Sequence, residues 1–191
     1  MIHHSAIAVK DVDKAHRFYT EAMGFELVAV VKRLAPAPTK GWTKHLFYDQ
    51  GDGTLFALWD LRGMEEAGAL DPDSWRGGFS KGMGLPYWIN HFAFTCSGPE
   101  EIEEKKQHWL AYGLNVAEIH HEFIHSIYTR DPDGTLVEWT YFTRALNQAD
   151  RERAQLLLAD DSPATEPDYP VELHHPPAST ADVDSQVAAS Y

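Results

Sequence analysis

Three side chains of metal-binding type stand at related positions in this chain. Glu138 lies in the β-rich run 135–142, directly after the tight turn of residues 131–134. A carboxylate within such a run is expected to be half-buried, and it then needs a cationic, hydrogen-bonding or metal partner. His4 and His91 each start a His-x-Ala pattern in a short predicted strand. Two imidazoles and one carboxylate on one side of an ion leave positions free for substrate, as in non-haem Fe(II) oxygenases.

An internal duplication makes these positions equivalent. The tetrapeptide Asp52-Gly53-Thr54-Leu55 recurs as Asp133-Gly134-Thr135-Leu136. When the repeated turns are aligned, Ala57 falls opposite Glu138. When the first strands are aligned, His4 falls opposite His91. The repeat therefore predicts two copies of one structural unit, with three of four equivalent slots occupied by metal-binding residue types.

Each copy has the pattern β-α-β-β-β. In the first copy, the hydrophobic pattern and the turn residues predict strands at 2–9, 25–34, 42–48 and 54–60 and a helix at 11–23. In the second copy they predict strands at 88–96, 114–119, 122–130 and 135–142 and a helix at 99–112. The domains expected are a first module at 1–60, a connecting loop or flap at 61–86, a second module at 87–144, a C-terminal helix at 145–160 and a largely disordered acidic tail at 161–191.

Composition limits the possible functions. The chain has 191 residues, 43% of them apolar, which is enough for one sizeable core or two small ones. A formal charge of −13 argues against nonspecific nucleic-acid binding. Its one cysteine, Cys96, excludes an internal disulfide framework and is typical of a reducing cytoplasm, where we expect the protein to be located. The sequence contains no apolar run long enough for a membrane span, and residues 1–9 do not read as a signal peptide.

Five motifs together carry a family resemblance. They are His4-Ser-Ala-Ile-Ala-Val-Lys-Asp11, Ala15-His-Arg-Phe-Tyr19, Gly24-Phe25, Asn90-His91-Phe-Ala93-Phe94 and Asp131-Pro-Asp-Gly-Thr-Leu-Val-Glu138. With these motifs the chain resembles the vicinal-oxygen-chelate superfamily, which includes glyoxalase I, type I extradiol dioxygenases, fosfomycin-resistance transferases, epimerases and bleomycin-binding proteins. The resemblance covers about residues 1–143. It implies an α+β fold in which two βαβββ modules form a cup-shaped sheet around a divalent metal, with His4, His91 and Glu138 as its ligands.

Within this superfamily, the residues favour an extradiol dioxygenase. Glyoxalase I uses four protein ligands, and Ala57 cannot be the fourth. Tyr128, ten residues before Glu138, is similar to the extradiol tyrosine that hydrogen-bonds a substrate oxygen. The resemblance also implies a histidine that acts as acid–base catalyst. We assign this role to His45, with His121 and His125 as rivals. His125 is disfavoured because it lies an odd number of residues from Tyr128 and should face away from it.

The sequence thus predicts a non-haem Fe(II) enzyme that cleaves a catechol-like aromatic substrate with dioxygen, and Mn(II) is the alternative metal. We expect a homo-oligomer, a dimer or larger, without a nucleic-acid or membrane partner. One alternative is a Mn- or Mg-dependent transferase, isomerase or lyase acting on adjacent oxygens. Another is a protein that sequesters an aromatic compound, although sequestration needs no metal triad. Pairing of the modules within one chain and swapping between chains are both open.

Overall fold

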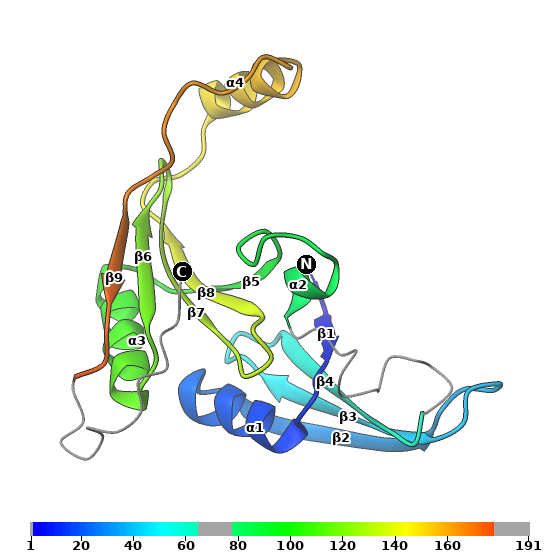
Figure 1. Ribbon diagram of the computed structural model, residues 1–191. Coiled ribbons are helices and arrows are strands. Elements are labelled where there is room, and N and C mark those ends of the chain that lie inside the picture. Colours follow the sequence, from blue (N-terminus) through cyan, green and yellow to red (C-terminus); the bar gives the residue numbers. More distant parts are fainter. Residues whose placement is uncertain (1, 65–77, 178–191) are drawn as a thin grey trace. The chain divides into compact units, whose positions relative to one another are not determined.

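The computed structural model describes residues 2–64 and 78–177, and these residues form two β-sheets (Figure 1). No helix within the described ranges is long and apolar enough to cross a membrane. The first sheet has the strand order β1 (His4–Ala8), β4 (Leu55–Arg62), β3 (Trp42–Asp49), β2 (Glu26–Leu34). The second has the order β5 (His91–Thr95), β8 (Leu136–Phe142), β7 (Ile124–Arg130), β6 (Val116–His120), β9 (Val171–His174).

The two sheets repeat one topology, which confirms the predicted pair of βαβββ modules and the α+β class. In the first module, β1 pairs in parallel with β4, while β3 pairs antiparallel with both β4 and β2. The order β1-β4-β3-β2 matches the order β5-β8-β7-β6. The helices that follow the first strand of each module are α1 (Val12–Arg17) with its extension η1 (Phe18–Ala22), and α3 (Pro99–Tyr112). Short helix α2 (Phe79–Gly82) precedes the second module.

The compact units of the structure differ from the sequence modules. One unit contains Met1–Phe94 together with Tyr128–Glu138, and the other contains Thr95–Ile127 together with Trp139–Tyr191. Strands β7 and β8 therefore each contribute to both units. The predicted connecting loop at 61–86 falls partly outside the described residues, which resume at residue 78 with α2.

The start of helix α1 is fixed by the side chain of its N-cap residue, Asp11. Asp11 Oδ1 accepts hydrogen bonds from the backbone N–H groups of Asp13 and Lys14, both at 3.1 Å. This bonding satisfies two of the donors that a helix start leaves free. The helix continues as the π-helical segment η1, within the predicted range 11–23. Its buried side chains include Ala15, Phe18 and Tyr19.

The core of the first unit is aromatic. Tyr19, Phe25, Phe56 and Phe94 are all buried. The ring centroids of Tyr19 and Phe56 lie 4.8 Å apart, and those of Phe25 and Phe94 lie 5.0 Å apart in an edge-to-face arrangement. Because aromatic pairs of this kind stabilise a fold beyond their burial alone, this cluster anchors η1 against β4 and β5.

The tight turn at 131–134 is present and is tied to the first helix. The Asp131 carbonyl accepts from Gly134 N–H at 2.9 Å, and Gly134 adopts φ 85°, a conformation that favours glycine. Asp131 Oδ1 accepts from the backbone N–H groups of Asp133 and Thr135 at 3.0 and 2.7 Å. The Tyr19 hydroxyl donates to Asp131 Oδ2 at 3.0 Å in a buried contact. One carboxyl group thus joins the turn that precedes Glu138 to η1.

Burial of Asp131 predicts a measurable pH effect on stability. Burial raises the pKa of this carboxyl to about 6, although the Thr135 N–H and Tyr19 O–H donors lower it. The unfolded chain loses this proton near pH 4 and the folded chain near pH 6, so the stabilisation from this group falls as the pH rises between those values. We expect the difference in free energy of unfolding between wild type and Asp131→Asn to shrink by about 2–3 kcal/mol from pH 4 to 6. Urea titrations of both proteins at each pH measure it, and a pH-independent difference would contradict it.

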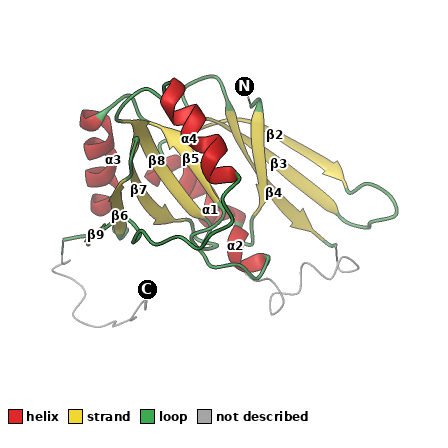
Figure 2. Cartoon of the chain, turned by 90° about the horizontal axis from the view of Figure 1, so that it is seen from above, coloured by secondary structure: helices red, strands yellow, loops and turns green. Residues whose placement is uncertain are grey.

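The C-terminal part of the second unit contains one strand that composition did not indicate and one helix that the sequence predicted. Strand β9 pairs antiparallel with β6, with Val116 opposite His174, inside the segment expected to be disordered. Helix α4 (Gln148–Leu158) lies within the predicted range 145–160 (Figure 2). Its cap residue, Asn147, forms a reciprocal capping box with Asp150. Leu156, Leu157 and Leu158 form an apolar run that would be expected to anchor this helix, but all three are exposed. Residues 178–191 of the predicted tail lie outside the described ranges.

Candidate functional site

Glu138 is buried, and its partner is His91. Only 2% of Glu138 is exposed, and its Oε2 lies 3.1 Å from His91 Nε2. The other ring nitrogen of His91, Nδ1, lies 3.1 Å from the Ile89 carbonyl oxygen, to which it donates. Hydrogen bonding to Glu138 raises the pKa of His91. The need for a partner that the sequence predicted for Glu138 is therefore met by an imidazole from strand β5.

This pair has features of a metal-binding half-site. A histidine that binds a metal typically donates its second ring N–H to a backbone carbonyl, which fixes the ring and directs the free nitrogen at the ion. His91 has this arrangement, with Ile89 as the acceptor. Two donor atoms at right angles, each about 2.1 Å from an ion, lie about 3.0 Å apart. The observed 3.1 Å between His91 Nε2 and Glu138 Oε2 fits that spacing.

Tyr128 lies beside His91. The two ring centroids are 6.2 Å apart, and the rings meet edge to face at 82°. Tyr128 comes from β7 and His91 from β5, while Glu138 comes from β8. Three of the five predicted site residues are thus brought together by the second module.

The other two predicted residues, His4 and His45, lie together in the first module. Their ring centroids are 6.3 Å apart. His45 stacks on Trp59 at 3.7 Å, and within the described residues its buried Nε2 has no hydrogen-bond partner. Burial and the nearby His4 lower the pKa of His45, so its ring is neutral at pH 7. His4 Nδ1 lies 2.9 Å from His3 Nδ1.

His4, His91 and Glu138 are not among the three-ligand groups found in the residues that the structure describes. Two groups of three potential ligands in residues 2–64 and 78–177 have ligand atoms all within 4.8 Å of one another. One is Glu118, His120 and His125, and the other is Glu118, Glu172 and His174. His4 is therefore not within that distance of both His91 and Glu138.

The rival acid–base histidines occupy other environments. His125 Nε2 lies 2.7 Å from Glu118 Oε1, and His121 packs edge-on against Tyr169 with centroids 5.1 Å apart. Sequence reasoning did not identify Glu118 and His120 as potential ligands. Their spacing of two residues on one strand face was the available signal. The sequence also places His174 in the tail expected to be disordered, whereas the His174 ring pairs with the Glu118 carboxylate.

A cavity of about 290 Å³ lies in the first unit. The small side chains of Ala6 and Ala8 border it, but neither His91 nor Glu138 lines it. Burial raises the pKa of Asp133, the acidic residue of its wall. The complete lining is Ala6, Ile7, Ala8, Gly78, Phe79, Asp133 and Thr135.

Comparisons with known proteins agree with this fold. The sequence-family model of the Glyoxalase/Bleomycin resistance protein/Dioxygenase superfamily matches residues 1–139 of this chain. A domain of this description from Frankia sp. EAN1pec is 18% identical, with a TM-score of 0.52, and the match covers 74% of this chain and 97% of that one. A lactoylglutathione lyase from Agrobacterium tumefaciens is 23% identical, with a TM-score of 0.47 and coverage of 73% and 92%. A fosfomycin resistance protein from Listeria monocytogenes is 19% identical, with a TM-score of 0.48 and coverage of 79% and 97%. No curated protein shows significant sequence similarity to the chain.

Proposed function

Because the chain belongs to the Glyoxalase/Bleomycin resistance protein/Dioxygenase superfamily, we propose that it is a metal-dependent enzyme acting on a substrate with two adjacent oxygens. The specific reaction proposed is extradiol cleavage of a catechol-like ring with dioxygen. The observation that carries this proposal is the contact of the buried Glu138 carboxylate with the carbonyl-oriented His91, next to Tyr128. Fe(II) is the proposed metal, and Mn(II) is the alternative.

Each residue has a chemical role in this proposal. His91 and Glu138 hold the ion with His4, and a bound Fe(II) supplies Lewis acidity and reactivity toward dioxygen. Tyr128, which packs edge-on against His91, orients one substrate oxygen with its hydroxyl group. The neutral His45 accepts a proton from the substrate, since its Nε2 has no hydrogen-bond partner in the described residues.

A second copy of the chain completes the proposed site. Within one copy, His4 and His45 form one group, while His91, Glu138 and Tyr128 form another. A partner subunit that contributes His4 would bring His45 with it, because the two rings are 6.3 Å apart. Strand β2 supports an oligomer, since it is exposed along its length and leaves Val28, Val30 and Val31 uncovered at 48%, 48% and 43% exposure.

Mixing two inactive variants tests this division of the site. His4→Ala and His91→Ala should each lose metal binding and activity. When they are unfolded, mixed and refolded together, mixed dimers regain one intact site. Roughly a quarter of the wild-type sites should then return, as random pairing of equal amounts dictates. If the mixture stays without metal while refolded wild type regains it, the ligands do not come from two subunits.

Oxygen uptake tests the reaction. Protein loaded anaerobically with Fe(II) should consume one dioxygen per ring of a catechol substrate and form a yellow ring-opened product. The Tyr128→Phe variant should keep its metal but turn over at least about tenfold more slowly. No oxygen uptake across a catechol panel, with turnover of a thiol or epoxide substrate by the Mn(II) protein, would replace the dioxygenase with a transferase or isomerase. Tight aromatic binding without any turnover would identify a sequestering protein.

A further inference from the structure

A second group of metal-binding side chains lies on strands β6 and β7 of the second unit. Glu118 and His120 are two residues apart on β6, so they share one face of the strand. His125 is the second residue of β7, just after a turn in which His121 N–H donates to the Ile124 carbonyl at 2.9 Å. The His120 and His125 rings stack, with centroids 3.8 Å apart. One ligand atom from each of the three residues lies within 4.8 Å of the other two.

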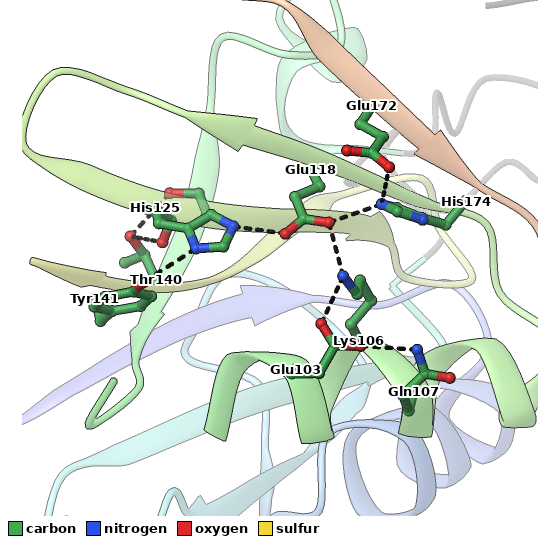
Figure 3. Close-up of polar contacts among 10 residues, drawn as sticks. Glu103, Lys106, Gln107, Glu118, His125, Thr140, Tyr141, Glu172 and His174 are labelled. Carbon is green, nitrogen blue, oxygen red and sulfur yellow. Dashed lines mark hydrogen bonds and ion pairs between the residues drawn. The ribbon is translucent and has the colours of Figure 1, made fainter. Parts of the chain in front are cut away.

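Surrounding side chains hold this group in place. The two oxygens of the Glu118 carboxylate have different neighbours (Figure 3). Oε1 lies 2.7 Å from His125 Nε2, whereas Oε2 accepts from Lys106 Nζ at 2.9 Å and lies 2.7 Å from His174 Nε2. The Tyr141 hydroxyl contacts the other ring nitrogen of His125, Nδ1, at 3.2 Å. Hydrogen bonds to the outer atoms of a carboxylate and an imidazole are the usual support of metal ligands.

We propose that Glu118 Oε1, His120 and His125 Nε2 bind a divalent ion of borderline softness, such as Zn²⁺, Co²⁺ or Ni²⁺. Two imidazoles and one carboxylate suit these ions better than Mg²⁺ or Ca²⁺. The ion takes the place of the proton shared by Glu118 Oε1 and His125 Nε2. His120 is exposed and gives the ion access from solvent, while Glu118 and His125 are buried at 7% exposure each.

The charges around Glu118 favour this position over its alternative. Lys106 carries one positive charge, and its ammonium group also pairs with Glu103 at 2.7 Å. One net negative charge therefore remains on the two carboxylates to attract an ion. The alternative group of Glu118, Glu172 and His174 would use Glu118 Oε2, beside the Lys106 ammonium. Repulsion from that ammonium, together with the 71% exposure of the Glu172 side chain, argues against an ion there.

The site links the hairpin of β6 and β7 to the C-terminal strand. His174 on β9 contacts the same carboxylate that would hold the ion, and β9 pairs with β6. An ion that binds the folded protein and not the unfolded chain stabilises the fold by an amount that grows with the logarithm of its free concentration. We expect Zn²⁺ to raise the melting temperature and to protect the β6 and β9 amides from hydrogen exchange.

Metal binding to the Glu138→Gln variant tests this site apart from the proposed catalytic centre. Isothermal titration with Co²⁺ should find one ion per chain, and the visible spectrum should report nitrogen and oxygen ligands. His120→Ala in this background should weaken binding at least tenfold. His108→Ala, which removes another exposed histidine, should leave it unchanged. His174→Ala removes only a contact to Glu118 Oε2 and should weaken binding less than His120→Ala does. Circular dichroism checks that each variant is folded.

Three results would overturn the inference. In the first, the Glu138→Gln protein binds no Co²⁺ up to about 1 mM. In the second, His120→Ala binds Co²⁺ as tightly as its parent. In the third, His174→Ala loses Co²⁺ binding while His120→Ala keeps it. The last result would place the ion between β6 and β9. None of these results depends on whether the protein is a dioxygenase, since catalytic activity is not measured.

Discussion

Glu138→Gln is expected to bind Mn(II) at least roughly 100-fold more weakly than the wild type. Glutamine has nearly the same shape as glutamate, so the fold should persist while the buried negative charge is lost. The remaining His91 lacks the anionic partner that draws a divalent ion to the site. Electron paramagnetic resonance of free Mn(II) during titration measures the affinity.

Glu104→Gln is the matched control for that measurement. Glu104 is an exposed residue of α3, and its substitution removes the same charge from the protein without touching the proposed site. Its Mn(II) affinity should equal that of the wild type. An equal loss in both variants would mean that the net charge of the protein, and not the Glu138 carboxylate, determines Mn(II) binding.

Asp131→Ala is expected to lower the free energy of unfolding by about 3–5 kcal/mol. The substitution leaves the N–H groups of Asp133 and Thr135 and the buried hydroxyl of Tyr19 without their acceptor. Each such group costs about 1–3 kcal/mol when it stays buried and unpaired. Equilibrium denaturation in urea, followed by tryptophan fluorescence and by circular dichroism, measures the loss.

A double-mutant cycle separates the turn from its anchor. Tyr19→Phe removes only the hydroxyl and should cost about 1–2 kcal/mol. Added to Asp131→Ala, it should cost much less, because the hydroxyl has then already lost its acceptor. Additive losses would show that the Tyr19–Asp131 hydrogen bond does not stabilise the fold. Asp52→Ala, at the exposed equivalent turn of the first module, should cost under about 1 kcal/mol.

The local patterns of this sequence predicted its modules well. The repeated Asp-Gly-Thr-Leu turns and the hydrophobic pattern of the strands each specify the backbone near them. The observed strand orders agree with the modules that these patterns predicted. The carboxylate of Glu138 was expected to have a partner because burial of a charge is costly. That reasoning needed no knowledge of which strands become neighbours.

Features that depend on distant contacts were missed. Strand β9 is short and polar, and its pairing with β6 rests on an edge that the sequence does not reveal. The Glu118 network joins residues up to 56 positions apart, and composition carries no information about such pairs. The two compact units also interleave in the sequence, since residues 128–138 belong to the same unit as residues 1–94. Alignment of the two repeats therefore could not indicate which residues share a site within one chain.

The hydrogen bond between Tyr19 and Asp131 has a consequence for how this protein is made. The Asp131 turn precedes the strand of Glu138 and accepts a hydrogen bond from the Tyr19 hydroxyl of η1. The ribosome synthesises η1 more than a hundred residues before this turn. The turn can form this bond only when the η1 segment is in place. A fragment that starts at residue 87 should therefore lack an ordered β8, even though its sequence contains a complete repeat.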